Sequence, residues 1–279
     1  MTVNSFSLYQ LSYRSDTFYD QEGFLFDTRQ YSLFKYGCHV SARIYADQIT
    51  ERLLRDYGHW RNEQVIVCAS AYKVAPTAAE AIAQLVYESL QGYFPLLQKA
   101  KVGRETVFAN DYGSMPTADR FSLMDRNILT IDDHLFRHKK LILVDDLRVT
   151  GAHERKLTDT IAGVVDEVVF AYVGFLQGDF LPSVEFDINN TAITSVNDIL
   201  AIIEKGLFHV NARVCKYVLS YQNLGELRSF LLEIPPAVLT RLDDCICGDG
   251  YHVMPEYETN YLLLREVLDG KPALLSLAV

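Results

Sequence analysis

The residues with the clearest chemical potential lie at positions 141–152, which read Leu-Ile-Leu-Val-Asp-Asp-Leu-Arg-Val-Thr-Gly-Ala. The four apolar residues 141–144 predict a strand that is buried on both faces, as in a parallel sheet. Asp145 and Asp146 follow where we expect that strand to end. A turn containing Gly151 comes next, and residues 154–162 predict a helix.

A turn that opens a helix presents unpaired backbone N–H groups, and such groups bind phosphate. Hydrogen bonds to a charged group are worth about 1.5–3 kcal/mol each, whereas the helix dipole adds only about 0.3–1 kcal/mol. We therefore expect the N–H groups of residues 150–154 to contribute more to phosphate binding than the helix dipole does. Gly151 would allow the backbone to approach the phosphate closely. Asp145 and Asp146 could accept hydrogen bonds from sugar hydroxyls or coordinate Mg²⁺.

A second possible anion site follows the apolar run 65–69, which we interpret as the first core strand. The loop 70–76 is rich in small residues and carries one cation, Lys73. Thr77 and Glu80 match a capping box, so we expect a helix to begin there. The alternative for Lys73 is a solvated surface charge on a loop.

The connection over residues 111–138 is long, polar and contains Gly and Pro. Such a connection inside a compact domain is typical of a functional flap, or it carries small elements of its own. Arg120 and Arg126 could close over an anion from this flap, or they could be two solvated arginines. Arg104, at the start of a strand predicted over 104–110, is a further candidate cation.

The elements around these sites indicate an α/β fold, a parallel sheet flanked by helices. The run 167–176 predicts another core strand, and the helix before it supplies the right-handed crossover expected of parallel strands. An apolar stripe over 40–56 predicts a helix that covers the sheet.

The two ends of the chain differ from this middle part. Residues 1–30 are rich in aromatic residues and predict strands or an extended arm, and residues 178–190 indicate loop and edge structure. From about residue 195 the pattern is mainly helical. We therefore predict an α/β core with an N-terminal arm over 1–190, and a mainly helical C-terminal cap over 191–279.

Composition is that of an ordinary globular protein, with 279 residues of which 49% are hydrophobic and 22% charged. The formal net charge of −10 argues against a nucleic-acid surface and means that a polyanion must be captured locally. We find no apolar stretch that could span a bilayer and no secretory pattern at the N-terminus. We therefore expect a cytoplasmic protein without a membrane partner.

The five cysteines form an odd and scattered set, which favours reduced thiols over a disulfide framework. Cys245, Cys247 and His252 are candidate metal ligands. Only these three lie close together in the sequence, and the Cys-x-Cys spacing is tighter than that of common structural zinc sites. We therefore favour packed side chains over a metal site there.

The stretch 141–152 resembles the ribose-5-phosphate-binding motif of type I phosphoribosyltransferases: an apolar strand, two acids, three variable residues and Thr-Gly. The residues Ala-Tyr-Lys at 71–73, with Pro76, are similar to the pyrophosphate-loop segment of orotate phosphoribosyltransferases. Phe-Lys-Tyr-Gly at 34–37, ahead of a helix, is a weaker family-like feature. The layout also looks like that of phosphoribosyltransferase-like proteins associated with tellurium-resistance operons.

The resemblance implies a Mg²⁺-dependent phosphoribosyltransferase that moves ribose 5-phosphate from phosphoribosyl pyrophosphate to a nitrogenous base or base-like acceptor, and a homodimer. Mg²⁺ and nearby cations would stabilise the leaving pyrophosphate, and the cap would shape the acceptor pocket. The candidate catalytic residues are Asp145, Asp146, Lys73, Arg104 and Arg120, with the two aspartates as metal ligands. The candidate ligand-binding residues are Ser70, Ala71, Tyr72, Val149, Thr150, Gly151, Ala152 and His153.

Two residues depart from the family pattern. Purine-salvage members often carry an aspartate base just before Thr-Gly, where this sequence has Val149, so a 6-oxopurine acceptor handled in that way is disfavoured. The position two after the glycine, often Thr or Ser, is His153, whose ring N–H could still donate to phosphate. These departures leave open a non-catalytic regulator on the same fold that senses phosphoribosyl pyrophosphate or a nucleotide.

Overall fold

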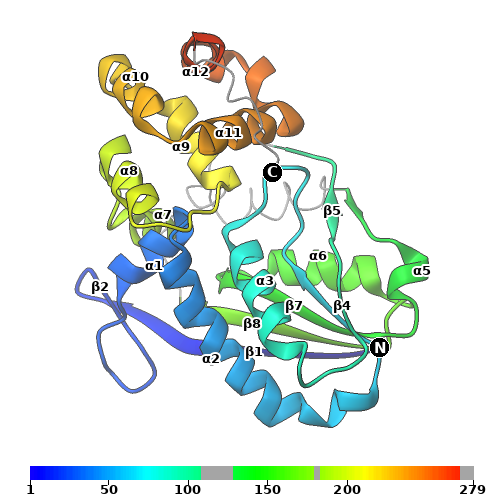
Figure 1. Cartoon of the computed structure of the whole chain (residues 1–279). Helices are drawn as coiled ribbons and strands as arrows, with labels where there is room; N and C mark the ends of the chain where they lie inside the picture. The colour runs from blue at the N-terminus through cyan, green and yellow to red at the C-terminus, as the bar shows by residue number, and fades with distance from the viewer. Residues whose placement is uncertain (108–127, 179–182, 271–279) are drawn as a thin grey trace.

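A computed structural model describes residues 1–107, 128–178 and 183–270 (Figure 1). Its centre is a six-stranded sheet in the order β2-β1-β8-β7-β3-β4, parallel throughout except for the edge strand β2. The strands are β1 (Thr2–Arg14), β2 (Thr17–Tyr19), β3 (Val65–Ala69), β4 (Leu97–Lys99), β7 (Lys140–Arg148) and β8 (Glu167–Leu176). A separate ribbon pairs β5 (Gly103–Arg104) with β6 (Leu129–Thr130).

Helices cover both faces of the sheet, as Figure 1 shows. Three helices pack on one face: α1 (Thr28–Lys35), α2 (His39–Tyr57) and α3 (Ala78–Leu90). On the other face lie α6 (Ala152–Ile161) and the short α5 (Asp133–Phe136). Strand β7 serves both layers because its side chains alternate: Ile142 and Val144 join the core under α2 and α3, while Leu141 and Leu143 join the core under α6. This double burial explains the continuous apolar run in the sequence.

The C-terminal part is helical and has an apolar core of its own, built around residues such as Val214, Leu227 and Leu264. We call α8 to α12 the hood; it lies at one end of the sheet layers, beside α1 and α7 (Figure 1). The helices are α7 (Ser183–Asn190), α8 (Val196–Glu204), α9 (Ala212–Ser220), α10 (Leu224–Glu233), α11 (Pro236–Asp249) and α12 (Glu258–Gly270), and the short 3₁₀ helices are η1 (Gly58–Asn62), η3 (Tyr251–Val253) and η4 (Pro255–Tyr257).

The predicted fold class, a parallel sheet flanked by helices with a mainly helical C-terminal part, is confirmed. Of the strands or extended arm predicted for residues 1–30, the structure shows the strands: β1 joins the main sheet in parallel with β8, and β2 pairs with β1. The partly exposed faces of β1 explain why it lacks an apolar run. Two other local predictions were wrong. Residues 183–190 form a helix rather than loop and edge structure, with Val184 and Ile188 buried one turn apart. Of the strand expected over 104–110, β5 includes only Arg104, residues 105–107 are not in a strand and residues 108–110 lie outside the described residues; β4 was missed.

The predicted start of α3 is right, but its capping box is wrong. Thr77 is the N-cap residue, yet its side chain makes no capping hydrogen bond. Its hydroxyl instead lies 3.0 Å from the Ser70 hydroxyl, and the Glu80 carboxylate pairs with Lys99. The side chains of Thr77 and Glu80 therefore contact the neighbouring loop and β4 instead of capping α3.

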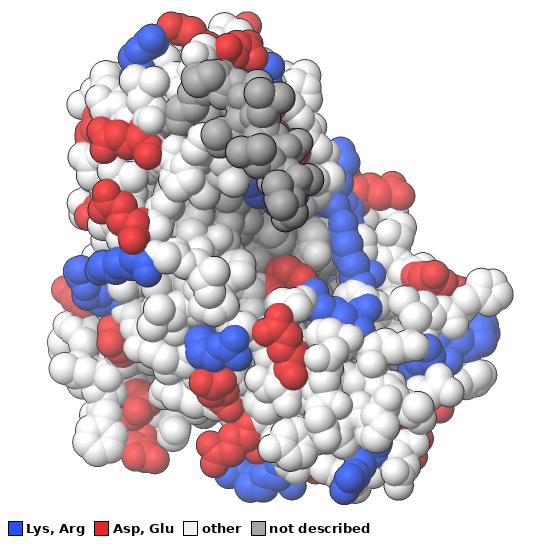
Figure 2. Space-filling view, in the orientation of Figure 1, with Lys and Arg blue, Asp and Glu red and all other residues white. Residues whose placement is uncertain are grey.

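Acidic and basic side chains are interspersed over the face shown in Figure 2. No helix among the described residues has the length and apolar character needed to cross a membrane.

Candidate functional site

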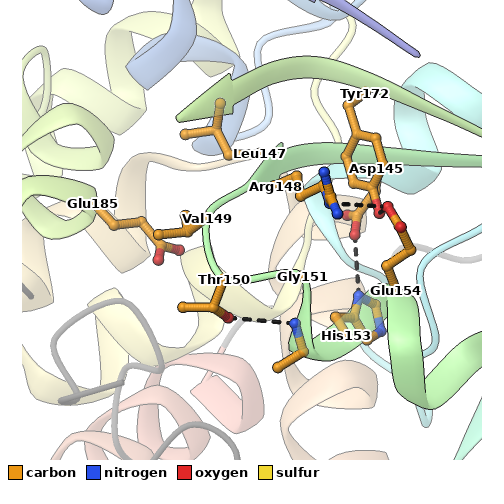
Figure 3. Close-up of a pocket in the computed structure, with 11 residues that line it drawn as sticks. Asp145, Leu147, Arg148, Val149, Thr150, Gly151, His153, Glu154, Tyr172 and Glu185 are labelled. Atoms are coloured by element: carbon orange, nitrogen blue, oxygen red, sulfur yellow. Dashed lines mark hydrogen bonds and ion pairs between the residues drawn. The ribbon is translucent and has the colours of Figure 1, made fainter. Parts of the chain in front are cut away.

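The corner between β7 and α6 is the centre of the candidate site (Figure 3). Gly151 is the N-cap residue of α6 and has φ +71°, a left-handed conformation that favours glycine. The Ala152 N–H donates to the Thr150 hydroxyl at 3.3 Å, which tightens the turn. Residues 150–154 line a cavity of about 40 Å³, together with Asp145 and Tyr172. Because one water needs about 10–15 Å³, this space admits a small polar group.

The two acids point to opposite faces of the sheet, as successive side chains of a strand must. Strand β3 ends at Ala69, opposite Val144, so Asp145 is the first residue of β7 that lies beyond its neighbour on that side. On the other side the pairing with β8 continues to Arg148. The strand therefore runs three residues past Asp145 rather than ending at the acids as predicted.

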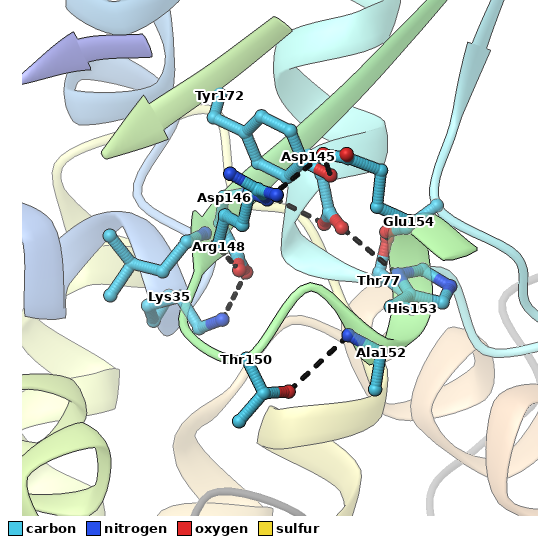
Figure 4. Close-up of polar contacts among 12 residues, drawn as sticks. Lys35, Thr77, Asp145, Asp146, Arg148, Thr150, Ala152, His153, Glu154 and Tyr172 are labelled. Atoms are coloured by element: carbon cyan, nitrogen blue, oxygen red, sulfur yellow. Dashed lines mark hydrogen bonds and ion pairs between the residues drawn. The ribbon is translucent and has the colours of Figure 1, made fainter. Parts of the chain in front are cut away.

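Asp145 faces α6 and is 8% exposed. Its Oδ2 lies 3.0 Å from the His153 Nδ1, and its Oδ1 accepts the Asp146 N–H at 2.9 Å (Figure 4). Burial alone would raise the pKa of Asp145, but the hydrogen bond and charge of His153, helped by the Asp146 N–H and the Ser70 hydroxyl, lower it below its ordinary value. The carboxylate is therefore held in its charged form.

Asp146 faces α1, where its carboxylate pairs with the ammonium group of Lys35 (Figure 4). The other carboxylate oxygen accepts the Leu147 N–H at 2.6 Å. The side chains of Lys35 and Asp146 are only 10% and 16% exposed, and the ammonium also lies 5.8 Å from the centre of the Tyr31 ring. Lys35 was not among the predicted site residues; its place in the segment 34–37, noted above as family-like, was the one available signal.

Arg148, which was not among the predicted site residues, places a guanidinium beside the turn of residues 150–154. Its Nε lies 3.1 Å from the Glu154 Oε2, and its guanidinium stands over the Phe175 ring at 5.1 Å. The same group lies 3.4 Å from where a Cβ on Gly151 would be. The cavity at the corner is thus lined by one basic side chain and by the acidic side chains of Asp145, Glu154 and Glu185.

Tyr172 on β8 fixes the position of Glu154 by donating its hydroxyl proton to Oε2 at 3.0 Å (Figure 3). Burial, with the nearby charges of Asp145 and Glu154, raises the pKa of Tyr172 well above its ordinary value. The phenol therefore stays protonated and remains a donor. The Arg148 guanidinium and the Tyr172 hydroxyl both contact the Glu154 Oε2, so this one carboxylate fixes the positions of both side chains.

The loop 70–76 lies beside the acids through Ser70, whose N–H donates to the Val144 carbonyl at 3.1 Å and whose hydroxyl bonds to Asp145. Ala71 is buried, and Tyr72 lies under the Lys101 ammonium, 4.4 Å from the ring centre. Burial raises the pKa of Tyr72 to about 12. The predicted ligand residue Ser70 is thus next to the acids, whereas the ring of Tyr72 packs against the Lys101 ammonium.

The predicted cations differ in their placement. Lys73 is exposed on the loop. Arg104 is tied to the loop through its backbone, because its N–H donates to the Tyr72 carbonyl at 3.1 Å, and its side-chain Nε is buried without a hydrogen-bond partner among the described residues. Arg120 and Arg126 lie outside the described residues. Val149 packs against the apolar core under α2 and α3.

The three candidate zinc ligands do not converge. Cys247 lies 3.1 Å from the Tyr261 hydroxyl, Cys245 is buried beside Cys215, and all five cysteines are free thiols. Among the described residues no cluster of three or more His, Cys, Asp or Glu side chains could hold a metal ion. A metal bound by Asp145 or Asp146 would therefore take its other ligands from water and substrate, as Mg²⁺ commonly does.

Sheet, corner and acids together define an α/β protein whose candidate site is a helix-opening turn at the carboxyl edge of the strands, where ligands of such sheets bind. The sequence matches the family PRTase ComF-like over residues 3–264, and the chain belongs to this family. This confirms the predicted relationship to phosphoribosyltransferases and places the protein among enzymes of the pentosyltransferase type. A comparison with curated proteins found no match.

Two solved structures are similar to parts of the chain. One is a hypoxanthine phosphoribosyltransferase from Staphylococcus aureus, with 7% identity, a TM-score of 0.31, and coverage of 54% of this chain and 77% of that one. The other is the UMP synthase of Leishmania donovani, with 14% identity, a TM-score of 0.28, and coverage of 66% of this chain and 36% of that one. The family assignment rests on the family match, which extends through the sheet core and through most of the hood.

Proposed function

We propose that the protein binds phosphoribosyl pyrophosphate at the corner of residues 150–154 and transfers its ribose 5-phosphate to a nitrogenous acceptor. The observation that carries this proposal is the corner itself, a left-handed Gly151 that opens α6 beside a cavity lined by Asp145. The first N–H groups of a helix lack intrahelical acceptors and suit the 5′-phosphate. Arg148 supplies a guanidinium at the same corner, and guanidinium groups bind phosphate oxygens strongly.

The acids serve the ribose in this proposal. Asp145 lies at the edge of the cavity in its charged form and can accept hydrogen bonds from sugar hydroxyls. Carboxylate, water and phosphate oxygens are the ligands that Mg²⁺ prefers, so the donor set at Asp145 and Asp146 fits this ion. When bound, Mg²⁺ would neutralise charge that develops on the leaving pyrophosphate.

The loop 70–76 serves the pyrophosphate end. Ser70 ties the start of this loop to Asp145, and Lys73 offers an exposed ammonium nearby in the sequence. A cation beside the leaving group stabilises the transition state of its departure. The hood, which contacts the same loop, would then shape the acceptor pocket.

A non-catalytic sensor of phosphoribosyl pyrophosphate is the second candidate. The observation that favours it is that both acids already have partners within the chain, Asp146 with the Lys35 ammonium and Asp145 with the His153 imidazole. Val149 in addition offers no general base before the Thr-Gly turn. A protein that only binds the donor needs neither a base nor acids free for catalysis.

Isothermal titration calorimetry with phosphoribosyl pyrophosphate, with and without Mg²⁺, tests the shared part of both candidates. We expect Mg²⁺-assisted binding that Asp145→Asn/Asp146→Asn weakens by about tenfold or more, because one lost hydrogen bond to a charged group is worth at least that factor. The control is Asp132→Asn/Asp133→Asn, which changes the same charge at another adjacent acid pair, exposed on α5. Equal affinity in all three proteins would contradict the proposal.

Turnover separates the two candidates. Pyrophosphate release is measured with the native protein, phosphoribosyl pyrophosphate, Mg²⁺ and a panel of purine, pyrimidine and pyridine bases. Release that depends on one base supports the transferase and names the acceptor class. Tight binding of the donor without release for any base supports the sensor. A homodimer remains a prediction, which sedimentation equilibrium of the native protein tests.

A further inference from the structure

The hood inserts a buried carboxylate into the loop 70–76. Asp249, the last residue of α11, is 3% exposed. Its Oδ1 accepts the Val74 N–H at 2.7 Å and the Ala75 N–H at 3.1 Å. Two successive backbone N–H groups that converge on one oxygen form an anion-binding nest. In this protein the nest is filled by the chain's own carboxylate, from 174 residues further along the sequence.

Two more contacts hold the same half of the loop. The Pro76 carbonyl accepts the Ala212 N–H, at the start of α9, at 2.9 Å. Gly248 lies so close that a Cβ added to it would stand 2.6–2.7 Å from the side chain of Val74. Three consecutive loop residues, 74–76, are therefore fixed to the hood.

The first half of the loop is fixed to the sheet layers instead. The Ser70 N–H donates to the Val144 carbonyl of β7 at 3.1 Å, and the Tyr72 N–H donates to the Val102 carbonyl at 3.3 Å. Lys73 lies between these two halves; its carbonyl accepts a hydrogen bond from the Lys101 ammonium, and its side chain is exposed. The backbone from which the Lys73 ammonium extends is thus set by the sheet on one side and by Asp249 on the other.

We propose that Asp249 is a positioning residue for donor binding: it fixes the loop so that Lys73 faces the pyrophosphate end of a bound ribosyl donor. This inference rests on the proposed function. It follows that the Val74 and Ala75 N–H groups are not available to pyrophosphate, since Asp249 takes both. The pyrophosphate contact then depends on Lys73 and on the N–H groups nearer the sheet.

The test compares two ligands by calorimetry, phosphoribosyl pyrophosphate with Mg²⁺ and ribose 5-phosphate. Both reach the phosphate corner, but only the first carries a pyrophosphate that reaches the loop. In Asp249→Ala we expect the affinity for the pyrophosphate donor to fall about tenfold, the value of one charged hydrogen bond, while the affinity for ribose 5-phosphate is unchanged. Asp249→Asn, which keeps an acceptor oxygen for both N–H groups, should restore most of the donor affinity.

Two further variants separate positioning from general damage. Asp243→Asn removes a carboxylate on the same helix that pairs with Arg265 and does not contact the loop, and it should leave both affinities unchanged. Gly248→Ala favours the helix intrinsically but pushes a methyl group into Val74, so it should weaken only the pyrophosphate donor, even if Asp249→Ala does not fold.

The possible results are distinct. Donor affinity at the native level in both Asp249→Ala and Gly248→Ala would overturn the inference. A parallel loss of both ligands in these variants would also overturn it, because it would show a general structural role. If the native protein binds neither ligand, the proposed function itself fails.

Discussion

The pair between Lys35 and Asp146 allows a quantitative test of how the acid pair is held. The variants are Lys35→Met, Asp146→Asn and the double substitution. Met keeps the length of the lysine side chain without its charge, and Asn keeps an oxygen that can accept the Leu147 N–H. The single variants therefore remove the ion pair with little change in packing.

The size of the effect follows from burial. An exposed ion pair contributes about 0–1 kcal/mol, whereas removal of one partner from a buried pair costs about 3–5 kcal/mol. With 10% and 16% of the two side chains exposed, this pair lies near the buried limit, so we expect each single variant to lose about 2–4 kcal/mol of the free energy of unfolding. The double variant should lose less than the sum, with a coupling of about 1–3 kcal/mol.

Urea denaturation at neutral pH measures these free energies for all four proteins. The matched control is the pair Arg228–Glu266 in the hood, whose side chains are 48% and 62% exposed and for which we expect no measurable coupling. Additive losses at Lys35 and Asp146, or a coupling no larger than that of the control pair, would refute the view that this carboxylate depends on Lys35.

Three further predictions concern the hood junction and the phosphate corner. Gly37→Ala should lower the free energy of unfolding, measured in the same urea experiment, by about 2 kcal/mol or more, since Gly37 has φ +87° and a Cβ would lie 2.4 Å from the His209 carbonyl oxygen. The control Gly58→Ala, with open space at its Cβ, should have little effect. Burial and the neighbouring His39 lower the pKa of His209 below 6.5, so as the pH falls the His209 ring is protonated in the unfolded state before it is protonated in the folded state. The free energy of unfolding should therefore fall as the pH drops through about 6.5, and its dependence on pH should be flatter in His209→Gln. Glu154→Gln removes a carboxylate from the phosphate cavity and should tighten the binding of inorganic phosphate measured by calorimetry, whereas weaker binding would show that Glu154 acts mainly by orienting its neighbours.

The sequence was informative where the physical signal is local. The run 141–144 is apolar throughout because β7 is buried on both faces, and Gly151 follows because the turn into α6 needs a positive φ. These two features were enough to predict the corner and the crossover helix behind it. The half-exposed β1 carries no comparable run, so its place in the sheet could not be predicted from its composition.

The partner of Asp146 could not be predicted, because it comes from a distant part of the chain. Lys35 reaches Asp146 from 111 residues away, and no periodicity links two such positions. Asp249 looked like one acid among many in the C-terminal region, and only its burial against the Val74 and Ala75 N–H groups distinguishes it. A buried charge marks such positions, but burial of a polar residue is a property of the fold and has no signature in a single sequence.

The contacts of the hood bear on the predicted boundary near residue 190. The side-chain amide of Asn211 donates to the Lys35 carbonyl at 3.1 Å, and the His209 N–H donates to the Gly37 carbonyl at 3.0 Å. With Asp249 on the loop 70–76, the hood thus holds both the segment that carries Lys35 and the loop that carries Lys73. A hood that only covered an acceptor pocket would not need these backbone contacts. We therefore expect a protein truncated after residue 190 to lose donor binding, measured by calorimetry, as well as acceptor selectivity.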